Sequence, residues 1–588
     1  MRIICCVLLL TAARYGACST SESFEEEAGY DCRPNQPCWP GREEWDKLNK
    51  TIGGNLRNTV PLAASCYLDS GFYNPDSCHE TAEDYKNSTR RSDVYGASEI
   101  LNWETCHKNG CTLQSVLPQL PPLFDWCALG RLSSVYVNAS KPDHVSETIK
   151  FARQHNIRLS IKNTGHDYFG RDTAPNSLAI WTHHMTNMTY HATFKGFQCS
   201  SADGKDIGEI GAGVQASEAY AFFEKHGMNV PGGNEGTVGL AGGFGQGGGH
   251  GVFGPSYGLM VDNAVEFDVV TADGKQHTIN ACNEPELFWA MRGGGGGTFA
   301  VLTAYRFQLH PAQPINLYTL RAEFPPLQAE QALRDFLAIH ADNQTTWSDN
   351  RIAGHAYYFP TKIEMYLVLP GGDEAVFRNL TSAYQTYAAN YPGLNILENR
   401  YSRFAEYSGL LRITQSIADR LTPSGFYEVL AGRLLPRNLF DPSKRDSLID
   451  AVLSGIKSSD NIIARAANIP TQIIMTTPAN RPDGEGTSVH PAWRHALWHL
   501  VYSGGWTDGI PSASQDHIVK HLLDAVEPVK SLTPGGGCYV NEGHYLEPDW
   551  KQTFFGSNYD KLLEIKKRYD PTHLFDCWKC VGWRGDSE

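Results

Sequence analysis

The sequence is poor in three features, and each scarcity excludes a class of protein. Basic residues are outnumbered, 50 Lys and Arg against 64 Asp and Glu, giving a formal charge of -14 with no Lys/Arg-rich run. Such a chain repels phosphates, so we expect no nucleic-acid partner. After the first 20 residues no stretch of 18 apolar residues occurs, so we expect no membrane-spanning helix. The motif Cys577-Trp578-Lys579-Cys580 has no second cysteine pair at zinc spacing, so we expect no metal.

The first 20 residues are typical of a secretory signal peptide. One positive charge at Arg2 precedes an apolar run too short to span a bilayer, and small residues follow up to Ser19. Without this leader, twelve cysteines remain, seven of them between Cys32 and Cys127. This crowding predicts a disulfide-bonded N-terminal extension, and in an oxidising compartment Cys577 and Cys580 are better explained as a structural bridge than as a redox motif.

The compartment implied by the leader is the secretory pathway. We expect a secreted or lumenal protein, with a vacuole as one possible destination. N-glycans are expected on some of the six Asn-x-Ser/Thr acceptors, at Asn49, Asn87, Asn138, Asn187, Asn343 and Asn379.

Changes in sequence pattern divide the chain into an α+β arrangement. After the signal peptide (1–20) comes a Cys-rich extension (21–125) without a catalytic signature. Residues 126–312 alternate strands and helices, beginning with a β-α-β unit at Ser133–Val137, a helix from Pro142, and Arg158–Lys162. Further strands are expected at Ser177–Trp181, Glu209–Val214 and Phe299–Leu309, with a hairpin turning at Asp273-Gly274.

A second lobe and a closing segment complete the predicted organisation. Residues 313–535 mix strands such as Glu364–Leu369 with helices such as Leu327–His340, and we expect a substrate-binding domain there. Residues 536–588 regain motif character, so we expect this segment to return to the first domain.

Two glycine-rich segments are the strongest functional signal. In the first, Asn163-Thr164-Gly165-His166 follows a strand, and Gly170 comes soon after. In the second, residues 231–251 contain eleven glycines. Glycine lets backbone N–H groups approach anionic oxygens closely, and so flexible a loop must be ordered by something bound to it. A large cofactor explains this better than a flexible linker, because apolar residues interrupt the glycines.

A nicotinamide site was the competing interpretation. Gly211-Ala212-Gly213-Val214-Gln215-Ala216 matches a GxGxxA fingerprint between a strand and a helix. About 20 residues further on, where an acidic residue should hold a ribose, the chain reads Gly227-Met228-Asn229-Val230-Pro231. The sequence therefore disfavours a nicotinamide cofactor.

Six motifs, taken in order, resemble the berberine bridge enzyme-like oxidases of the vanillyl-alcohol oxidase and p-cresol methylhydroxylase superfamily. They are Asn163–His166, Gly236–Gly239, Gly247–Gly251, Tyr257–Asn263, Leu287–Gly297 and Tyr539–Asn541. The resemblance implies a two-domain FAD-binding fold of that type with an antiparallel-sheet substrate domain, and places the disulfide-rich extension before it.

The same resemblance implies the cofactor and the site residues. His166 matches the histidine that is linked to the 8α-methyl of FAD, whereas Glu235 stands where many relatives have a second, cysteinyl link, so attachment through His166 alone is expected. Tyr539 and Asn541 match residues beneath the flavin and are candidates for proton transfer and substrate positioning, and His250 is a candidate polar group on the substrate side, or simply a hydrogen-bonded histidine. The candidate FAD-binding residues are His166, Asn163, Thr164, Gly165, Gly170, Gly233, Gly236, Thr237, Gly239, Gly242, Gly243, Gly249, Asp262 and Asn263.

These features imply an oxidase acting on a small organic alcohol or secondary metabolite. Such an enzyme passes a hydride to FAD and the electrons to O2, giving H2O2. Two alternatives stay open at this point: a flavin-fold cyclase acting without net oxidation, and a carbohydrate oxidase.

Overall fold

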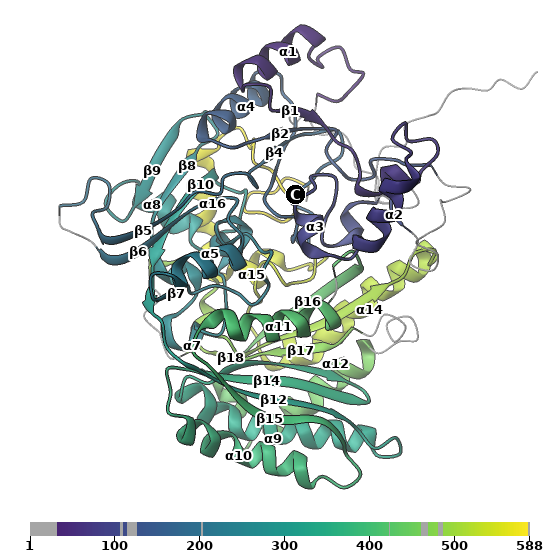
Figure 1. Ribbon diagram of the computed structural model, residues 1–588, viewed down its shortest axis with the longest axis vertical. Helices are drawn as coiled ribbons and strands as arrows, with labels where there is room; N and C mark the ends of the chain where they lie inside the picture. The colour runs from purple at the N-terminus through teal and green to yellow at the C-terminus, as the bar shows by residue number, and fades with distance from the viewer. Residues whose placement is uncertain are drawn as a thin grey trace, which may run out of the picture.

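The computed structural model describes residues 32–105, 110–113, 126–200, 204–422, 424–459, 469–479 and 486–585 (Figure 1). The predicted signal peptide lies outside these residues. Three larger β-sheets and one two-stranded pair, β11(His310–Pro311) with β7(Met228–Asn229), are surrounded by helices. The α+β class and the disulfide-rich N-terminal region are confirmed.

The first sheet contains the predicted β-α-β unit, which leads into the first glycine-rich loop. Its order is β1-β2-β4-β3, with β1(Leu56–Asn58), β2(Val135–Asn138), β4(Leu178–Trp181) and β3(Leu159–Lys162). Helix α4(Pro142–Gln154) starts at its proline and buries Val145, Ile149 and Ala152, as the helical spacing predicted. Strands β2 and β3 both pair parallel with β4, which lies between them. Strand β3 ends directly before Asn163 and so delivers the first glycine-rich loop.

A five-stranded antiparallel sheet forms the rest of this lobe. Its order is β5(Met188–Phe194), β6(Gly204–Gly211), β10(Val301–Gln308), β8(Ala264–Val270) and β9(Gln276–Asn280). The predicted hairpin forms across Asp273-Gly274, with Gly274 at φ 78°. The strand predicted at Glu209–Val214 was wrong in its limits, because the chain turns after Gly211, where Gly213 packs against the His183 carbonyl, before helix α5(Ala216–Glu224).

The second lobe is a seven-stranded antiparallel sheet whose strands are buried on both faces except at the edge strand Asn395–Phe404. Its order is β15(Asn395–Phe404), β12(Ile315–Glu323), β14(Lys362–Pro370), β13(Ala353–Phe359), β17(Thr471–Ile474), β18(Ala496–Trp506) and β16(Tyr427–Pro436). Alternate residues of one strand serve two cores, since Tyr358 faces helices α9(Ala329–Asp349), α10(Glu374–Asn390), α12(Arg445–Ser459) and α14(Ser512–Leu532), whereas Tyr357 faces helix α11(Tyr407–Leu421) and the first lobe. The Tyr357 face therefore closes over the glycine-rich loops.

The N-terminal extension has more regular structure than its composition predicted. It forms α1(Arg42–Thr51), α2(Pro75–Asp84), α3(Ser88–Ser92) and 3-10 turns at Leu62–Cys66 and Leu101–Trp103. Disulfides join Cys32 to Cys38, Cys66 to Cys78 and Cys111 to Cys127. Further bonds join Cys199 to Cys282 and Cys577 to Cys580, which supports the structural reading of the last pair, while Cys538 is a buried free thiol.

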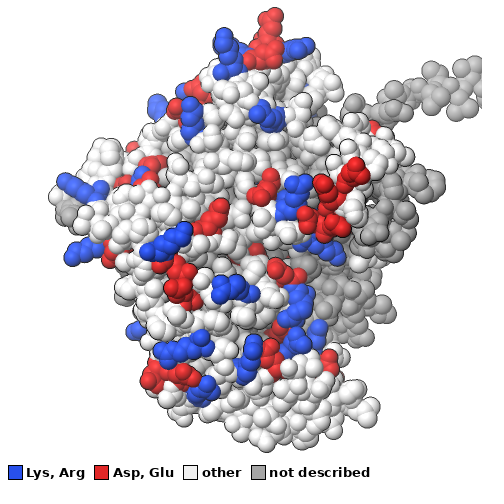
Figure 2. Space-filling model, in the orientation of Figure 1, with Lys and Arg blue, Asp and Glu red and all other residues white. Residues whose placement is uncertain are grey.

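Short elements fill the connections. They are the turns Leu240–Phe244, Met260–Asn263, Arg437–Phe440, Pro491–Arg494 and Gly556–Asn558, and the helices α6(Gly245–Gly247), α7(Gly254–Tyr257) and α8(Pro285–Met291). In the described part of the chain no helix is long and apolar enough to cross a membrane. On the face shown in Figure 2, acidic and basic side chains are interspersed.

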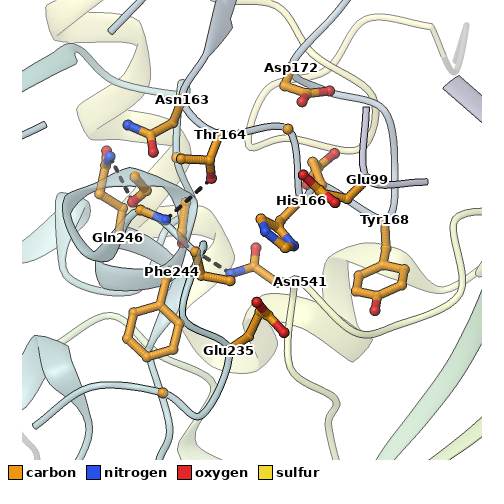
Figure 3. Close-up of a pocket in the computed structure, with 18 of the residues that line it drawn as sticks. Glu99, Asn163, Thr164, His166, Tyr168, Asp172, Glu235, Phe244, Gln246 and Asn541 are labelled. Atoms are coloured by element: carbon orange, nitrogen blue, oxygen red, sulfur yellow. Dashed lines mark hydrogen bonds between the residues drawn. The ribbon is translucent and has the colours of Figure 1, made fainter. Parts of the chain in front are cut away.

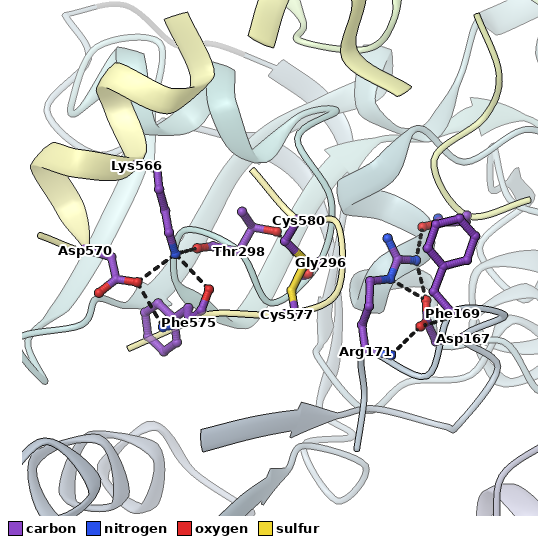
Figure 4. Close-up of a disulfide and its surroundings, with 11 residues drawn as sticks. Asp167, Phe169, Arg171, Gly296, Thr298, Lys566, Asp570, Phe575, Cys577 and Cys580 are labelled. Atoms are coloured by element: carbon purple, nitrogen blue, oxygen red, sulfur yellow. Dashed lines mark hydrogen bonds and ion pairs between the residues drawn. A yellow bond between two sulfur atoms is a disulfide. The ribbon is translucent and has the colours of Figure 1, made fainter. Parts of the chain in front are cut away.

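The closing segment forms α15(Trp550–Phe555) and α16(Tyr559–Tyr569), and α16 packs against both α15 and α8. Its anchor is Lys566, whose ammonium bonds Asp570 Oδ2 at 2.7 Å, the Thr298 carbonyl at 2.6 Å and the Phe575 carbonyl at 2.8 Å (Figure 4). Both charged side chains are at most 1% exposed. This buried ion pair fixes the C-terminus beside the Gly296 loop.

Removing the ammonium should therefore destabilise the enzyme. Lys566→Met leaves the Asp570 carboxylate buried without its cation, which costs about 3–5 kcal/mol of unfolding free energy. Chemical denaturation followed by tryptophan fluorescence measures this loss. Lys567→Met removes an exposed lysine from the same helix and is the control. If both variants unfolded at the same denaturant concentration, Lys566 would not have the anchoring role.

Candidate functional site

A cavity of about 310 Å³ lies where the two lobes and the closing segment meet. Figure 3 shows side chains converging on it, with Asn163, Thr164 and Gln246 on one side and Glu99 and Tyr168 on the other. Eleven of the residues predicted from the sequence line it: Asn163, Thr164, Gly165, His166, Gly233, Gly239, Gly242, Gly243, His250, Tyr539 and Asn541. The structure therefore brings both glycine-rich segments and the C-terminal motif to one site.

His166 projects into this cavity from a tight loop. Gly165 before it adopts φ 94°, a left-handed conformation that favours glycine. Burial, and secondarily the charge of Lys162, lowers the pKa of His166 to about 3, so the imidazole is neutral at physiological pH. Its Nε2 lies 2.8 Å from Thr237 Oγ1. A neutral, oriented imidazole at a cavity wall retains a nitrogen lone pair that can form a covalent bond.

The second glycine-rich loop brings backbone to the cavity surface. An added Cβ at Gly239 would lie 1.7 Å from Asn163 Oδ1, so only glycine allows the two loops to approach this closely. At Gly243 an added Cβ would meet no atom within 4 Å, which shows that the backbone there borders open space. Such a surface suits a ligand that is bound along main-chain N–H groups, as a pyrophosphate is.

Polar atoms without protein partners mark the same cavity. Among the described residues, Asn163 Oδ1, both carboxylate oxygens of Glu99 and both of Asp172 are buried without a hydrogen bond. Burial raises the pKa of Glu99 to about 8 and that of Asp172 to about 6. Buried polar groups are normally satisfied, so these atoms fit a large ligand with several hydroxyl and amide groups, such as FAD. Glu99 comes from the N-terminal extension, in which the sequence shows no catalytic signature.

Tyr539 and Asn541 hold one wall in place. The Tyr539 hydroxyl accepts hydrogen bonds from the Gly249 N–H at 3.2 Å and from Asn541 Nδ2 at 2.9 Å. Asn541 accepts one from Arg171 at 3.0 Å. Burial, followed by the charge of Glu542, raises the pKa of Tyr539 well above its usual value. The phenol therefore stays protonated, which argues against Tyr539 as a base and favours a positioning role.

A carboxylate among histidines forms part of the cavity wall. His250 Nε2 lies 3.1 Å from Glu542 Oε1, and His499 Nδ1 lies 3.3 Å from Glu542 Oε2. His250 Nδ1 also contacts Thr476 Oγ1 at 2.9 Å. Burial would raise the pKa of Glu542, but the facing histidines lower it to about 2. Glu542 is thus an ionised, half-buried carboxylate, and its oxygens and the two imidazoles also lie within the 4.8 Å spacing of a cation site.

The other six predicted residues lie outside the cavity lining. Thr237 supports His166, Gly249 supports Tyr539, and Gly236 donates its N–H to Gln415. Gly170 is needed for packing, since an added Cβ would lie 2.4 Å from the Trp103 ring. Asp262 pairs with Arg494 at 2.7 Å, and Asn263 donates to the Tyr257 and Leu259 carbonyls. Asp262 and Asn263 thus have protein partners, and neither lines the cavity.

Comparison with known proteins agrees with this geometry. The model of the "FAD binding domain" family matches residues 133–280, and that of the "Berberine and berberine like" family matches residues 538–579. FAD-linked oxidoreductase ZEB1 of Gibberella zeae is 32% identical over 94% of this chain and 92% of its own length. This chain belongs to the VAO-type FAD-linked oxidoreductases. It is an FAD-dependent enzyme.

Further relatives of the VAO-type oxidoreductases extend the match. The flavoprotein oxidase VAO615 of Thermothelomyces thermophilus is 31% identical over 92% of both chains. The crystal structure of VAO-type flavoprotein MtVAO615 from Myceliophthora thermophila superposes with TM-score 0.82 at 28% identity, covering 94% of this chain and 97% of that one. The VAO-type fold predicted from the sequence is therefore confirmed.

The structure also argues against a nicotinamide-binding role for the GxGxxA segment at residues 211–216. The N–H groups of Ala216 and Ser217, at the start of α5, bond to the Val238 and Gly236 carbonyls. They are not available to a nicotinamide pyrophosphate. Gly213 is explained by packing, because an added Cβ would lie 2.0 Å from the His183 carbonyl oxygen.

Sequence reasoning missed several cavity residues of this VAO-type enzyme. They are Glu99, Asp172, His355, Tyr357, Tyr366, Glu428 and Glu542. Glu542 directly follows the recognised Tyr539–Asn541 motif, so extending that motif by one residue would have found it. Asp172 follows the first glycine-rich loop, Glu99 comes from the extension, and the other four come from the second lobe. No local signal marks these six residues. By contrast, Trp493 and Trp498 do not line the cavity and are buried in the core.

Proposed function

We propose that this FAD-linked oxidoreductase is an oxidase of small hydroxylated organic molecules, with FAD linked covalently to His166 alone and O2 as electron acceptor. When bound, FAD accepts a hydride from the substrate carbon and passes the electron pair to O2, which becomes H2O2. The observation that carries the proposal is the ionised Glu542, placed among histidines in the same cavity that His166 lines.

Each part of the cavity has a role in this proposal. His166 would anchor the flavin, while the Asn163–His166 and Gly239–Gly243 backbones would bind its phosphates. Glu542 Oε would accept the proton of the substrate hydroxyl, and His250 and His499 would hold that carboxylate in position and spread its charge. The protonated Tyr539 would fix the wall beside them, and Tyr357 and Tyr366 would exclude water.

The experiment is an anaerobic titration of the flavin-loaded protein with benzylic, allylic and secondary aliphatic alcohols and with oligosaccharides. Bleaching of the visible flavin band by an alcohol, followed by one H2O2 per turnover on admitting air, supports the proposal. Product formation without peroxide would favour a cyclase, and bleaching by oligosaccharides alone would favour a carbohydrate oxidase. If none of these compounds bleached the flavin, the alcohol-oxidase assignment would be wrong.

We further propose that the protein passes through the secretory pathway, where five described disulfides can form and be kept. Three acceptor asparagines, Asn87, Asn187 and Asn379, are exposed, whereas Asn49, Asn138 and Asn343 are half-buried. Asn343 Nδ2, the atom a glycan would modify, donates to the Ile339 carbonyl at 2.7 Å.

We therefore expect glycans at Asn87, Asn187 and Asn379 and none at the half-buried acceptors. Peptide mapping after enzymatic deglycosylation of protein secreted by a fungal host reads out each site. Glycosylation confined to Asn138 and Asn343, or retention of the protein in the cytosol, would contradict this expectation.

A further inference from the structure

Three side chains at the cavity, His166, Thr237 and Glu235, form a continuous hydrogen-bonded chain. Thr237 Oγ1 lies 2.8 Å from His166 Nε2 and donates to Glu235 Oε1 at 3.0 Å. The Thr237 N–H also bonds Glu235 Oε1, at 3.2 Å. Gln415 fixes the far end, since its Nε2 donates to Glu235 Oε2 at 2.7 Å. Thr237 is buried, and Glu235 lines the cavity (Figure 3).

The chemistry of the three groups gives this chain a direction. A carboxylate can only accept hydrogen bonds, and a hydroxyl has a single proton to donate. Because Thr237 gives its proton to Glu235, its oxygen must accept from His166, which places the imidazole proton on Nε2. The lone pair of the neutral ring is then on Nδ1. Thr237 and Glu235 therefore select the tautomer of His166.

We propose that Thr237 and Glu235 are a proton relay that positions His166 and accepts its Nε2 proton while the imidazole becomes attached to FAD. This inference rests on the proposed attachment through His166. The bond forms between Nδ1 and the 8α carbon of the flavin. The 8α-methyl loses one proton and the imidazole the other, through Thr237 to Glu235, and the two electrons are left on the flavin. O2 then takes the electron pair and two protons and leaves as H2O2.

The arrangement explains why a ring kept neutral by its surroundings can complete this reaction. Attack by Nδ1 places a positive charge on an imidazole in a site where burial disfavours that charge. A carboxylate two hydrogen bonds away can accept the proton and restore the neutral ring, as in other relays through a hydroxyl or imidazole. Removing either relay member should slow attachment while leaving the FAD-binding loops intact.

The test compares covalent flavin in full-length variants expressed and purified identically. Thr237→Val removes the hydroxyl, Thr237→Ser keeps it, and Glu235→Gln and Glu235→Ala remove the carboxylate. Thr148→Val, a buried threonine outside the cavity lining whose hydroxyl bonds the His144 carbonyl within its own helix, is the matched control. Flavin fluorescence of the denatured band gives the covalent fraction. Its increase on incubation with FAD in air gives the attachment rate, and absorbance of the native protein gives total bound FAD.

We expect Thr237→Val and Glu235→Gln to bind FAD but attach it about 100-fold more slowly than wild type. Thr237→Ser and Thr148→Val should match wild type, and formate should accelerate attachment in Glu235→Ala, a rescue that a purely structural role would not produce. Wild type with covalent flavin and Thr237→Val attaching it equally fast would overturn the relay alone. Wild type without covalent flavin would overturn the proposed attachment and the relay with it.

Discussion

The His166→Ala variant should purify as a folded protein from which acid releases all of the flavin. The His166 imidazole is the group that we propose to form the covalent bond, and none of the described cysteines that line the cavity is a free thiol able to replace it. Loss of the bond also frees the flavin to shift against the Glu542 wall. We expect kcat/KM to fall by about 10- to 100-fold, or ~1.4–2.8 kcal/mol of transition-state stabilisation.

Acid precipitation followed by absorbance of pellet and supernatant measures attachment, and stopped-flow reduction of the flavin measures the rate. His226→Ala, which removes an exposed histidine from the same lobe, is the control and should keep a yellow pellet. A yellow pellet from His166→Ala would place the link on another residue. An unchanged rate in a variant with free flavin would show that the bond has no part in orienting the ring.

Replacing Glu542 by glutamine should slow flavin reduction by the substrate about 10²- to 10⁴-fold, the usual contribution of a positioned general base. The amide keeps the size of the side chain but cannot accept the hydroxyl proton. It also leaves His250 and His499 without the negative charge that they face. Binding of FAD should be unaffected, because the Glu542 carboxylate faces His250 and His499 rather than the Asn163–His166 and Gly239–Gly243 backbones.

Stopped-flow reduction with the best alcohol of the titration series gives the effect directly. Glu564→Gln, on the exposed face of α16, controls for the loss of one carboxylate elsewhere. Reoxidation of the chemically reduced flavin by O2 should be the same in Glu542→Gln and wild type. Substrate reduction within threefold of wild type would exclude Glu542 as the proton acceptor.

Local patterns predicted the scaffold well because they are set by neighbours in sequence. Pro142 and the spacing of Val145, Ile149 and Ala152 located α4, and Asp273-Gly274 located a hairpin. The loop around His166 was predictable for the same reason, since a strand, a left-handed glycine and a histidine are adjacent in the chain. The strand at β6 was misplaced because the close packing of Gly213 on His183 is a tertiary contact.

The cavity wall around Glu542 was only partly predictable, because distant segments assemble it. His250, His499 and Glu542 come from three separate parts of the chain, and no spacing links them. Glu99 reaches the cavity from an extension whose composition indicated only disulfides. The structure favours positioning over proton transfer as the role of Tyr539, because burial beside Glu542 keeps the phenol protonated. The burial of these side chains and the charges around them are set by the tertiary fold and cannot be read from the local sequence.

The attachment of FAD to His166 is the central claim, and peptide mapping of the acid-precipitated wild-type protein tests it most directly. The account predicts a yellow pellet and a single flavin-bearing peptide that contains His166, heavier by one FAD less two hydrogens. A colourless pellet with the flavin in the supernatant, or a flavin on a peptide without His166, would contradict it.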